Sequence, residues 1–313
     1  MREPIDTMAL LRELEPVVEV NLNRHLATAK EWFPHEFVPW SLGRDFDGPL
    51  EGVEWSPDQS AIPDVARTSL IVNLLTEDNL PSYHHEIATL FGRDGAWGTW
   101  VHRWTAEEGR HGIAIRDYLL TTRAVDPVAL ERARMVHMST GYDSSNDGVI
   151  ESLAYVSFQE LATRVSHRNT GRISGDPVCD QLLAKVAADE NLHMLFYRNL
   201  LAAAFELAPD VTMRAICRVA TTFQMPGNGI ENFNRKSVQI AMAGIYDLRI
   251  HHDEVLIPVL RQVKAMERTG LSGDGEAARE ELAVFLDDLD RKAARFVERR
   301  DAARDKLTAR AAA

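Results

Sequence analysis

The sequence predicts an all-α protein with a four-helix bundle at its centre and further helices around it. Apolar residues recur at three- and four-residue intervals along most of the 313 residues, which is the period of amphipathic helices. No segment shows strand alternation or a glycine-rich phosphate loop. Carboxylates also interrupt four of the apolar stripes. We expect a single domain over residues 1–313, with the bundle at about 66–205 and C-terminal helices at about 206–313.

The periodicity predicts the elements in chain order. The first helix, at 8–29, places Leu11, Leu14, Val18 and Leu22 on one face. Residues 41–64 lack a helical period and are rich in Gly, Pro and Asp, which indicates an ordered covering segment or, as the alternative, a mobile one. Further helices are expected at 66–90, 96–122, 127–139, 149–168, about 177–205, 210–223, 232–265 with a break around 251–258, and 275–310.

Proline and glycine mark the boundaries of these helices. Asp126-Pro127 and Asp176-Pro177 each predict an N-cap followed by a first-turn proline. Pro81 predicts a kink, because it lacks the N–H that would bond to the carbonyl of Glu77. The glycines within residues 171–175 predict a turn.

Two Glu-x-x-His motifs occupy positions that should face the core. Glu108 and His111 continue the apolar stripe of one helix, and Glu190 and His193 continue that of another. Residues three apart lie on the same face of a helix. A buried carboxylate without a partner costs several kcal/mol, so these positions predict a compensating group.

Glu77 and Glu160 break two further apolar stripes in the same way. The separations 160 − 77 = 83, 190 − 108 = 82 and 193 − 111 = 82 show that the second half of the set repeats the first. One glutamate from each of two helices, with Glu-x-x-His from each of the other two, is the ligand set of ferritin-like proteins that bind two metal ions. A lone Glu-x-x-His is more often a solvated helix pair, so only the complete set supports this interpretation.

The types of ligand narrow the choice of metal ion. Carboxylates and imidazoles without thiolates suit two iron ions, as Fe2+, or manganese in their place. Reduced iron in such a site can bind and split dioxygen. Thr163, one turn after Glu160, is either a hydroxyl satisfied by its own helix or a proton donor to the oxygen chemistry. Asp189 either supports a ligand imidazole or lies at the surface.

Composition excludes several other classes. The net charge of −12 argues against a nucleic-acid partner. No run is long enough to span a membrane, and the N-terminus lacks the pattern of a signal peptide. Cys179 and Cys217 form no metal or redox motif and fit a reducing compartment. We therefore expect a soluble, cytoplasmic protein.

Several segments closely resemble the soluble acyl-carrier-protein desaturases of plants and mycobacteria. They are L-T-E-D-N-L-P-S-Y at 75–83, W-T-A-E-E-G-R-H-G at 104–112, S-F-Q-E-L-A-T at 157–163 and A-A-D-E-N-L-H at 187–193. E-W-F-P-H-E-F-V-P at 31–39, M-P at 225–226 and G-I-Y at 244–246 are further landmarks. The resemblance covers nearly the whole chain in collinear order.

The resemblance implies a homodimeric diiron enzyme of lipid metabolism that desaturates a fatty acyl chain carried on acyl carrier protein. It would use dioxygen and electrons from a ferredoxin-type donor. Glu77 and Glu160 would be terminal ligands, Glu108 and Glu190 bridging ligands, and His111 and His193 nitrogen ligands. Thr163 would assist the oxygen chemistry, while Trp32, Asp189 and His111 would line an electron route.

Two features depart from the resemblance. The plant enzymes have mostly uncharged residues where this chain has His84-His85-Glu86, which leaves the substrate channel and acyl length open. The chain is also acidic overall, so contact with an acidic carrier requires a basic patch, either at Arg235-Lys236 or within 291–310. The competing interpretations are a diiron hydroxylase or oxidase, a metal-storage protein, and a carrier-binding relative without catalysis. A radical protein of the ribonucleotide reductase kind is disfavoured, because we find no tyrosine one turn from a ligand in a convincing radical position.

Overall fold

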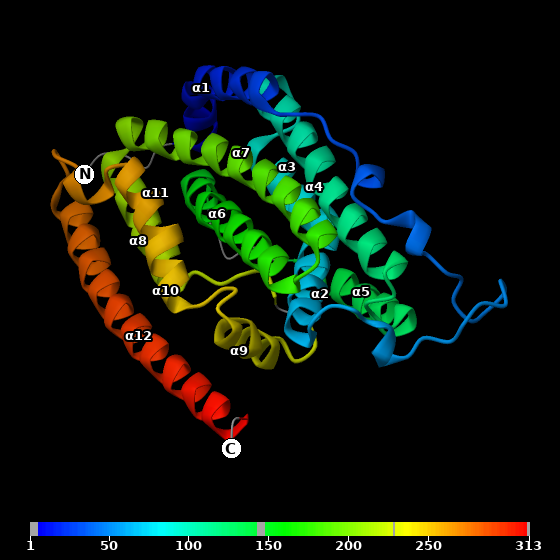
Figure 1. Cartoon of the computed structure of the whole chain (residues 1–313). Helices are drawn as coiled ribbons and strands as arrows, with labels where there is room; N and C mark the ends of the chain where they lie inside the picture. The colour runs from blue at the N-terminus through cyan, green and yellow to red at the C-terminus, as the bar shows by residue number, and fades with distance from the viewer. Residues whose placement is uncertain (1–5, 143–147, 228, 312–313) are drawn as a thin grey trace.

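The computed structural model describes residues 6–142, 148–227 and 229–311, most of them helical (Figure 1). Across these ranges the only β pairing is an isolated bridge between Phe46 and Val53. The predicted all-α fold is confirmed. The helices are α1 (Thr7–Thr28), α2 (Asp64–Asp78), α3 (Leu80–Phe91), α4 (Gly95–Thr121), α5 (Pro127–Thr140), α6 (Val149–Ser174), α7 (Pro177–Leu207), α8 (Pro209–Thr222), α9 (Phe233–Ala243), α10 (Leu248–Ile250), α11 (Ile257–Gln262) and α12 (Gly273–Ala311).

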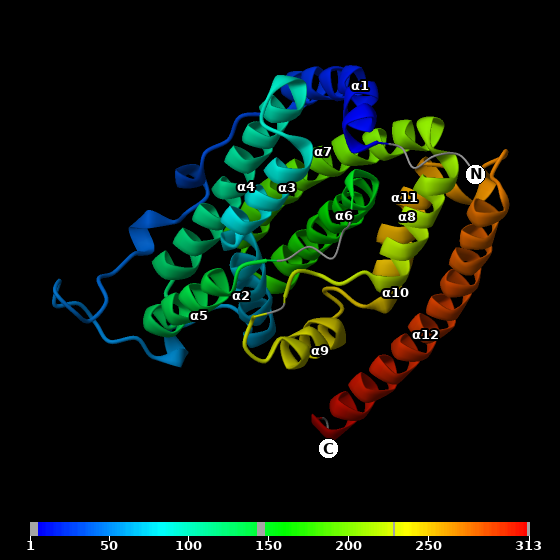
Figure 2. The ribbon, with the colours of Figure 1, turned by 180° about the vertical axis from the view of Figure 1, so that it is seen from behind.

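Helices α2, α4, α6 and α7 form the central bundle (Figures 1 and 2). α2 packs on α4 and α6, and α7 packs on α6 and α4, which closes the bundle. Gly171 allows α6 and α7 to approach closely, because a Cβ at this position would lie 2.9 Å from Asp180 Oδ1. The other helices surround this centre. α1 packs on α4 and α7, α3 on α4, α5 and α9 on α2, and α8 on α6, α7 and α12.

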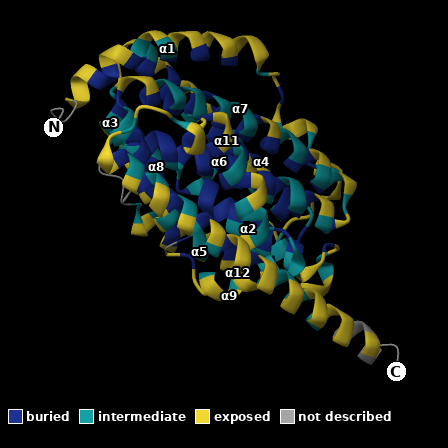
Figure 3. Cartoon of the chain, turned by 90° about the vertical axis from the view of Figure 1, so that its left-hand side faces the viewer, coloured by how far each residue is buried: buried dark blue, intermediate teal, exposed yellow. Residues whose placement is uncertain are grey.

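Two apolar clusters occupy different parts of the bundle. The first contains Trp100 of α4 and Phe196 of α7, whose rings stack with centroids 3.5 Å apart. The second contains Ile115 of α4 and Leu183 of α7. The middle turns of both helices therefore lie between the two clusters. In Figure 3 buried residues face this interior, whereas α1 and α12 are largely exposed on their outer sides.

Two predicted boundaries are wrong in instructive ways. The predicted helix with a kink is instead two helices, which are separated at Asn79. Glu77 lies on α2, and α3 begins at Leu80 with Pro81 as its second residue. Proline is tolerated there because first-turn N–H groups have no helical partner. α6 continues through Gly171 to Ser174 and is capped by Gly175, whose φ of 66° is left-handed. Only Gly175 has the expected turn role, because Gly171 serves helix packing.

The break predicted at 251–258 lies earlier in the structure. The chain leaves α9 at Gly244, whose φ is 77°, and residues His251–Leu256 form a π-helical turn. The two predicted N-caps are confirmed. Asp126 accepts a hydrogen bond from the N–H of Val128 at 2.8 Å, and Asp176 accepts one from Val178 at 3.0 Å.

The segment before α2 covers the end of α4, as expected for an ordered segment. The buried guanidinium of Arg123 donates to the carbonyls of Asp45 and Val53 and to the side chain of Gln59. One cation thus ties three parts of the segment together. No helix in the described part of the chain is long and apolar enough to cross a membrane. The single domain and the cytoplasmic location stay predictions.

Candidate metal centre

The four bundle helices bring six charged side chains together between the two apolar clusters. None of the six residues is more than 7% exposed. They are Glu77 of α2, Glu108 and His111 of α4, Glu160 of α6, and Glu190 and His193 of α7.

The ligand atoms of these residues form two overlapping groups, each with its atoms within 4.8 Å of one another. Glu77 and His111 belong to one group, whereas Glu160 and His193 belong to the other. Glu108 and Glu190 belong to both groups. This sharing is what two adjacent metal ions with bridging carboxylates require.

Each imidazole points one nitrogen at the cluster and the other at a supporting carboxylate. Nδ1 of His111 lies 3.3 Å from Glu108, and its Nε2 lies 3.3 Å from Asp189. Nδ1 of His193 lies 2.7 Å from Glu108, and its Nε2 lies 2.9 Å from Glu107. When Nε2 carries the proton and donates it to a carboxylate, Nδ1 keeps its lone pair and can bind a metal ion. The supporting carboxylates therefore fix the tautomer that metal binding requires.

The supports are exchanged between the two motifs. Asp189 precedes Glu190 in the second motif but holds His111 of the first, whereas Glu107 of the first motif holds His193 of the second. Glu107 was missed in the sequence analysis. The repeat could have found it, because 189 − 107 = 82 is the separation already seen between the motifs. The supporting role predicted for Asp189 agrees with its contact to His111.

Glu107 also connects the cluster to α1 and to the surface. The Nε2 atom of His25 lies 2.9 Å from the same oxygen that contacts His193, and Arg103 donates to the other oxygen at 2.6 Å. His25 is buried and stacks on His193 with ring centroids 5.8 Å apart. α1 therefore helps to fix the second histidine, a role that periodicity alone did not indicate.

Three of the four cluster glutamates also receive hydrogen bonds from neighbouring side chains. Trp104 donates to Glu160 at 3.0 Å, and Thr163 lies 2.8 Å from Glu190. Thr163 Oγ1 also lies 3.0 Å from the carbonyl of Glu160 in its own helix, so both roles considered for it are geometrically present. His167 lies 3.1 Å from Glu77 and 3.2 Å from the amide nitrogen of Asn73. These contacts orient the carboxylates before any cation binds.

The cluster keeps unsatisfied atoms that point at its centre. Nδ1 of each histidine lies within 3.3 Å of a Glu108 oxygen, but neither contact has the geometry of a hydrogen bond, and no other described residue supplies one. One carboxylate oxygen of each of Glu108, Glu160 and Glu190 also lacks a hydrogen-bond partner among the described residues. Buried polar atoms are rarely left unpaired in proteins. The donor set therefore fits two hard or borderline cations such as iron or manganese. Cys179 and Cys217 are free thiols outside the set.

The electrostatics of the cluster agree with this interpretation. Burial and the charge of Glu190 raise the pKa of Glu108, and burial with the neighbouring carboxylates raises the pKa of Glu160 well above its ordinary value. Burial opposes the charged forms of His111 and His193, yet the surrounding carboxylates raise both pKa values well above normal. Protons thus take the place of cations in the metal-free cluster.

One further path leads from the cluster to the surface. Trp32 donates its Nε1–H to Asp189 at 2.9 Å and stacks on His111 with an interplanar angle of 11°. The guanidinium of Arg110 lies over the Trp32 ring and donates to Asp189 at 2.5 Å. The three residues predicted for an electron route, Trp32, Asp189 and His111, are thus in contact.

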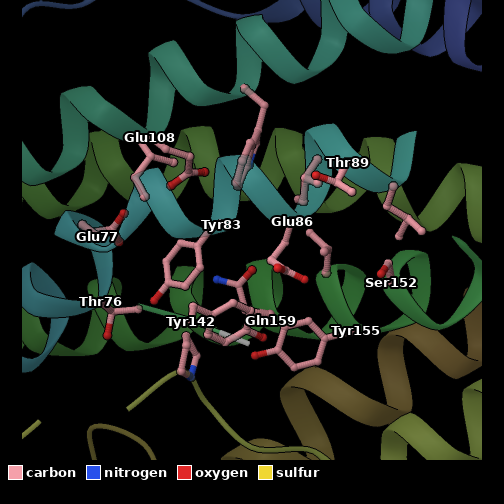
Figure 4. A pocket seen from close by; sticks show the side chains of 16 residues that line it. Thr76, Glu77, Tyr83, Glu86, Thr89, Glu108, Tyr142, Ser152, Tyr155 and Gln159 are labelled. Carbon is pink, nitrogen blue, oxygen red and sulfur yellow. The ribbon is translucent and has the colours of Figure 1, made fainter. Parts of the chain in front are cut away.

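Two cavities reach the cluster from different sides. The larger, of about 200 Å³, touches Glu77 and Glu108 and extends between α3 and α6 (Figure 4). The smaller, of about 90 Å³, touches Glu77 and Thr163 and extends to α9. Thr76, Glu77 and Pro226 line both cavities. An extended ligand that enters one cavity would therefore pass the cluster on its way to the other.

Comparisons with known proteins identify the family of this chain. A family model described as fatty acid desaturase matches residues 6–312. DesA1 of Mycobacterium tuberculosis, provisionally named an acyl-[acyl-carrier-protein] desaturase, is 52% identical over 298 residues, which cover 93% of this chain and 88% of DesA1. The chloroplastic stearoyl-[acyl-carrier-protein] 9-desaturase of Simmondsia chinensis is 31% identical over 299 residues, which cover 88% of this chain and 74% of that protein.

A solved structure extends the comparison to three dimensions. The X-ray structure of M. tuberculosis DesA2, also provisionally named an acyl-ACP desaturase, matches with a TM-score of 0.70 and 32% identity. The match covers 88% of this chain and 99% of the DesA2 chain. It confirms the predicted fold class, a ferritin-like bundle with additional helices. The chain therefore belongs to the fatty acid desaturase family, whose members are oxidoreductases.

Proposed function

We propose that the protein is an O2-dependent desaturase that introduces a double bond into a fatty acyl chain carried on acyl carrier protein. The observation that carries this proposal is the pair of ligand groups that share Glu108 and Glu190 beside a cavity. Two iron ions in these groups would supply the activation of dioxygen, and manganese fits the same ligands. The family of the chain supports the substrate class, because its relatives are named for acyl-carrier-protein substrates.

Each ligand has a distinct role in the proposal. Glu77 and His111 would bind one ion, while Glu160 and His193 would bind the other, the histidines through Nδ1. Glu108 and Glu190 would bridge the ions. Asp189 and Glu107 hold the imidazoles in the tautomer that leaves Nδ1 free.

Thr163 is the residue best placed to hold a proton near the cluster. Its hydroxyl lies 2.8 Å from Glu190 and lines the smaller cavity. It can therefore donate either to the bridging carboxylate or to a group that enters this cavity. The contact with the backbone carbonyl of Glu160 keeps the hydroxyl oriented when neither the Glu190 carboxylate nor a group in the cavity accepts its hydrogen bond.

The cavities suggest how the acyl chain lies. The smaller cavity is lined by Phe233, Ser237 and Ile240 of α9, and α9 also carries the exposed Arg235. We propose that the carrier protein docks on α9 and that the acyl chain passes Glu77 into the larger cavity. Of the two basic segments expected to bind the carrier, Arg235-Lys236 is favoured because it adjoins a cavity. In the other segment, Arg300 is already paired with Asp247.

A second basic surface fits the electron donor. A depression of about 560 Å³ has Trp32 and Asp189 among its lining residues. We propose that a ferredoxin-type acidic protein docks here and passes electrons through Trp32, Asp189 and His111. A concentration of cations on a chain of net charge −12 favours an acidic partner. The cations of the depression are Lys30, Arg164, Arg168, Arg172 and Lys185.

A single-turnover experiment tests the reaction. Iron-loaded, chemically reduced protein is mixed with dioxygen and a long-chain acyl carrier protein, and the released acid is analysed by mass spectrometry. Loss of two hydrogens is the expected result. Gain of one oxygen would replace the proposal with a hydroxylase, and an unchanged acid despite two bound ions would exclude desaturation of that substrate.

A variant separates the electron route from the chemistry. Trp32→Phe removes the Nε1–H that donates to Asp189 but keeps an aromatic ring. We expect chemically reduced Trp32→Phe to complete a single turnover, whereas steady turnover with the ferredoxin-type donor falls. Equal steady rates for the variant and the wild type would contradict the route. The homodimer implied by the family resemblance stays a prediction that sedimentation analysis tests.

A further inference from the structure

The larger cavity runs away from the metal centre between two helices. On α3 its lining residues are Leu80, Tyr83, Glu86, Ile87, Thr89 and Leu90, of which Leu80, Tyr83, Ile87 and Leu90 follow one another at helical spacing. Leu80 lies at the start of α3, close in sequence to Glu77, and Leu90 lies near its end. Ten residues of helix span about 15 Å. The cavity is therefore long enough for the terminal part of an acyl chain.

α6 lines the opposite side in the reverse direction along the chain. Gln159 adjoins Glu160 of the cluster, and Val156, Tyr155 and Ser152 follow toward the beginning of the helix. Both walls thus begin at the metal centre and extend away from it. Leu80, Ile87, Leu90, Trp104 and Val156 give the cavity apolar surface that suits methylene groups.

Glu86 interrupts this apolar path. Figure 4 shows its carboxyl group pointing from α3 into the space toward Gln159 and Tyr155. Methylene groups cannot hydrogen-bond to a carboxylate, so a chain that passes Glu86 must bury apolar groups against a polar, ionisable one, which opposes extension beyond that point. The neighbouring His84 is directed elsewhere and bonds to Thr105 of α4 at 2.7 Å. His85 is exposed.

We propose that Glu86 is a specificity-determining residue that sets how far an acyl chain extends beyond the metal centre. This inference rests on the proposed function. Six residues of helix from Leu80 to Glu86 span about 9 Å. An extended chain advances about 1.2 Å per bond, since three polypeptide bonds span about 3.3–3.6 Å. The segment between the metal centre and Glu86 therefore holds about seven or eight carbons.

The test measures binding, so that it does not depend on turnover. Acyl carrier proteins with saturated chains of increasing length are titrated calorimetrically into metal-loaded protein without a reductant. Affinity should rise about fourfold per methylene, equivalent to about 0.8 kcal/mol, while each added group is buried. The increase should stop at the chain length whose methyl end reaches Glu86.

Three variants decide whether Glu86 causes this limit. In Glu86→Leu the limit should move to chains about five carbons longer, because Leu90 lies four residues, or about 6 Å, farther along α3. Glu86→Gln keeps the volume but removes the charge, and should move the limit in the same direction by less. His85→Leu adds a leucine at an exposed position of the same helix and should leave the limit unchanged.

The outcomes separate the inference from the proposed function. A limit that stays in place in Glu86→Leu would overturn the inference, even if the protein desaturates its substrate. A shift in Glu86→Leu without any in Glu86→Gln would overturn the role of charge and assign the limit to side-chain volume. A third outcome would also overturn the inference. If the wild type bound chains with a terminal hydroxyl more tightly than equally long alkyl chains, and Glu86→Leu lost this preference, Glu86 would be a polar recognition group instead of a limit on chain length. If binding follows the expected pattern but no desaturation occurs, only the proposed desaturase function is refuted.

Discussion

The exchanged supports of the two histidines predict selective loss of one metal ion. Glu107→Ala removes the carboxylate that holds Nε2 of His193 at 2.9 Å, whereas Asp189→Ala removes the one that holds Nε2 of His111. Loss of such an outer contact typically weakens metal binding about 10- to 100-fold, which is about 1.4–2.7 kcal/mol. Glu107→Ala should therefore weaken the ion bound by His193, and Asp189→Ala the ion bound by His111.

An anaerobic titration with Fe2+ or Mn2+, followed by calorimetry, measures both affinities. The wild type should bind two ions per chain, and each variant should bind one ion about as well as the wild type and the other more weakly. Arg103→Ala is the matched control. It removes a half-exposed partner from Glu107 but leaves the oxygen that faces His193, and solvent screens such contacts. Two tightly bound ions in Glu107→Ala, with helical content retained, would refute the supporting role.

Three further results are expected. The metal-free protein should melt at lower temperature as the pH rises above about 6.5, because the surrounding carboxylates raise the pKa values of His111 and His193 well above the ordinary value of 6.5, and the stabilising protons are lost as the pH rises through the raised values. Bound metal should remove this dependence, and a flat metal-free profile in melting experiments would contradict it. Leu14→Ala should lower the free energy of unfolding by about 2–5 kcal/mol, because Leu14 is fully buried. Val20→Ala, on the exposed face of α1, should change the free energy of unfolding by no more than about 0.5 kcal/mol. Denaturant titrations measure both values. Thr163→Val should retain both metal ions but slow single-turnover desaturation by about a hundredfold, and an unchanged rate would remove Thr163 from the chemistry.

The sequence was sufficient to predict that the six residues meet in the bundle, because the constraint there is severe; their role as metal ligands stays a prediction. Buried carboxylates on apolar stripes are rare, and their repeat at 82–83 residues left few arrangements. The helices that carry the six residues were therefore predicted together with the site. The two Asp-Pro starts were equally clear, since capping depends on local chemistry.

Features that depend on partners distant in sequence were not predictable in the same way. Gly171 was interpreted as a turn residue, although its lack of a side chain serves the contact with Asp180. His25 and Arg123 lie in stretches without a motif, and only the fold shows that each is buried among polar partners. The break at Asn79 was predicted as a kink, because proline chemistry alone does not distinguish a bent helix from two helices.

That break divides two tasks between neighbouring helices. Glu77, a member of the ligand cluster, lies in the last turn of α2, whereas α3 forms one wall of the larger cavity. Substitutions in α3 can thus alter the cavity while α2, anchored to α4 and α6, keeps the carboxylate in place. Relatives with the same catalytic centre could diverge in the chains they accept through changes in this one short helix. Libraries aimed at new acyl specificities would best begin with its cavity-facing positions.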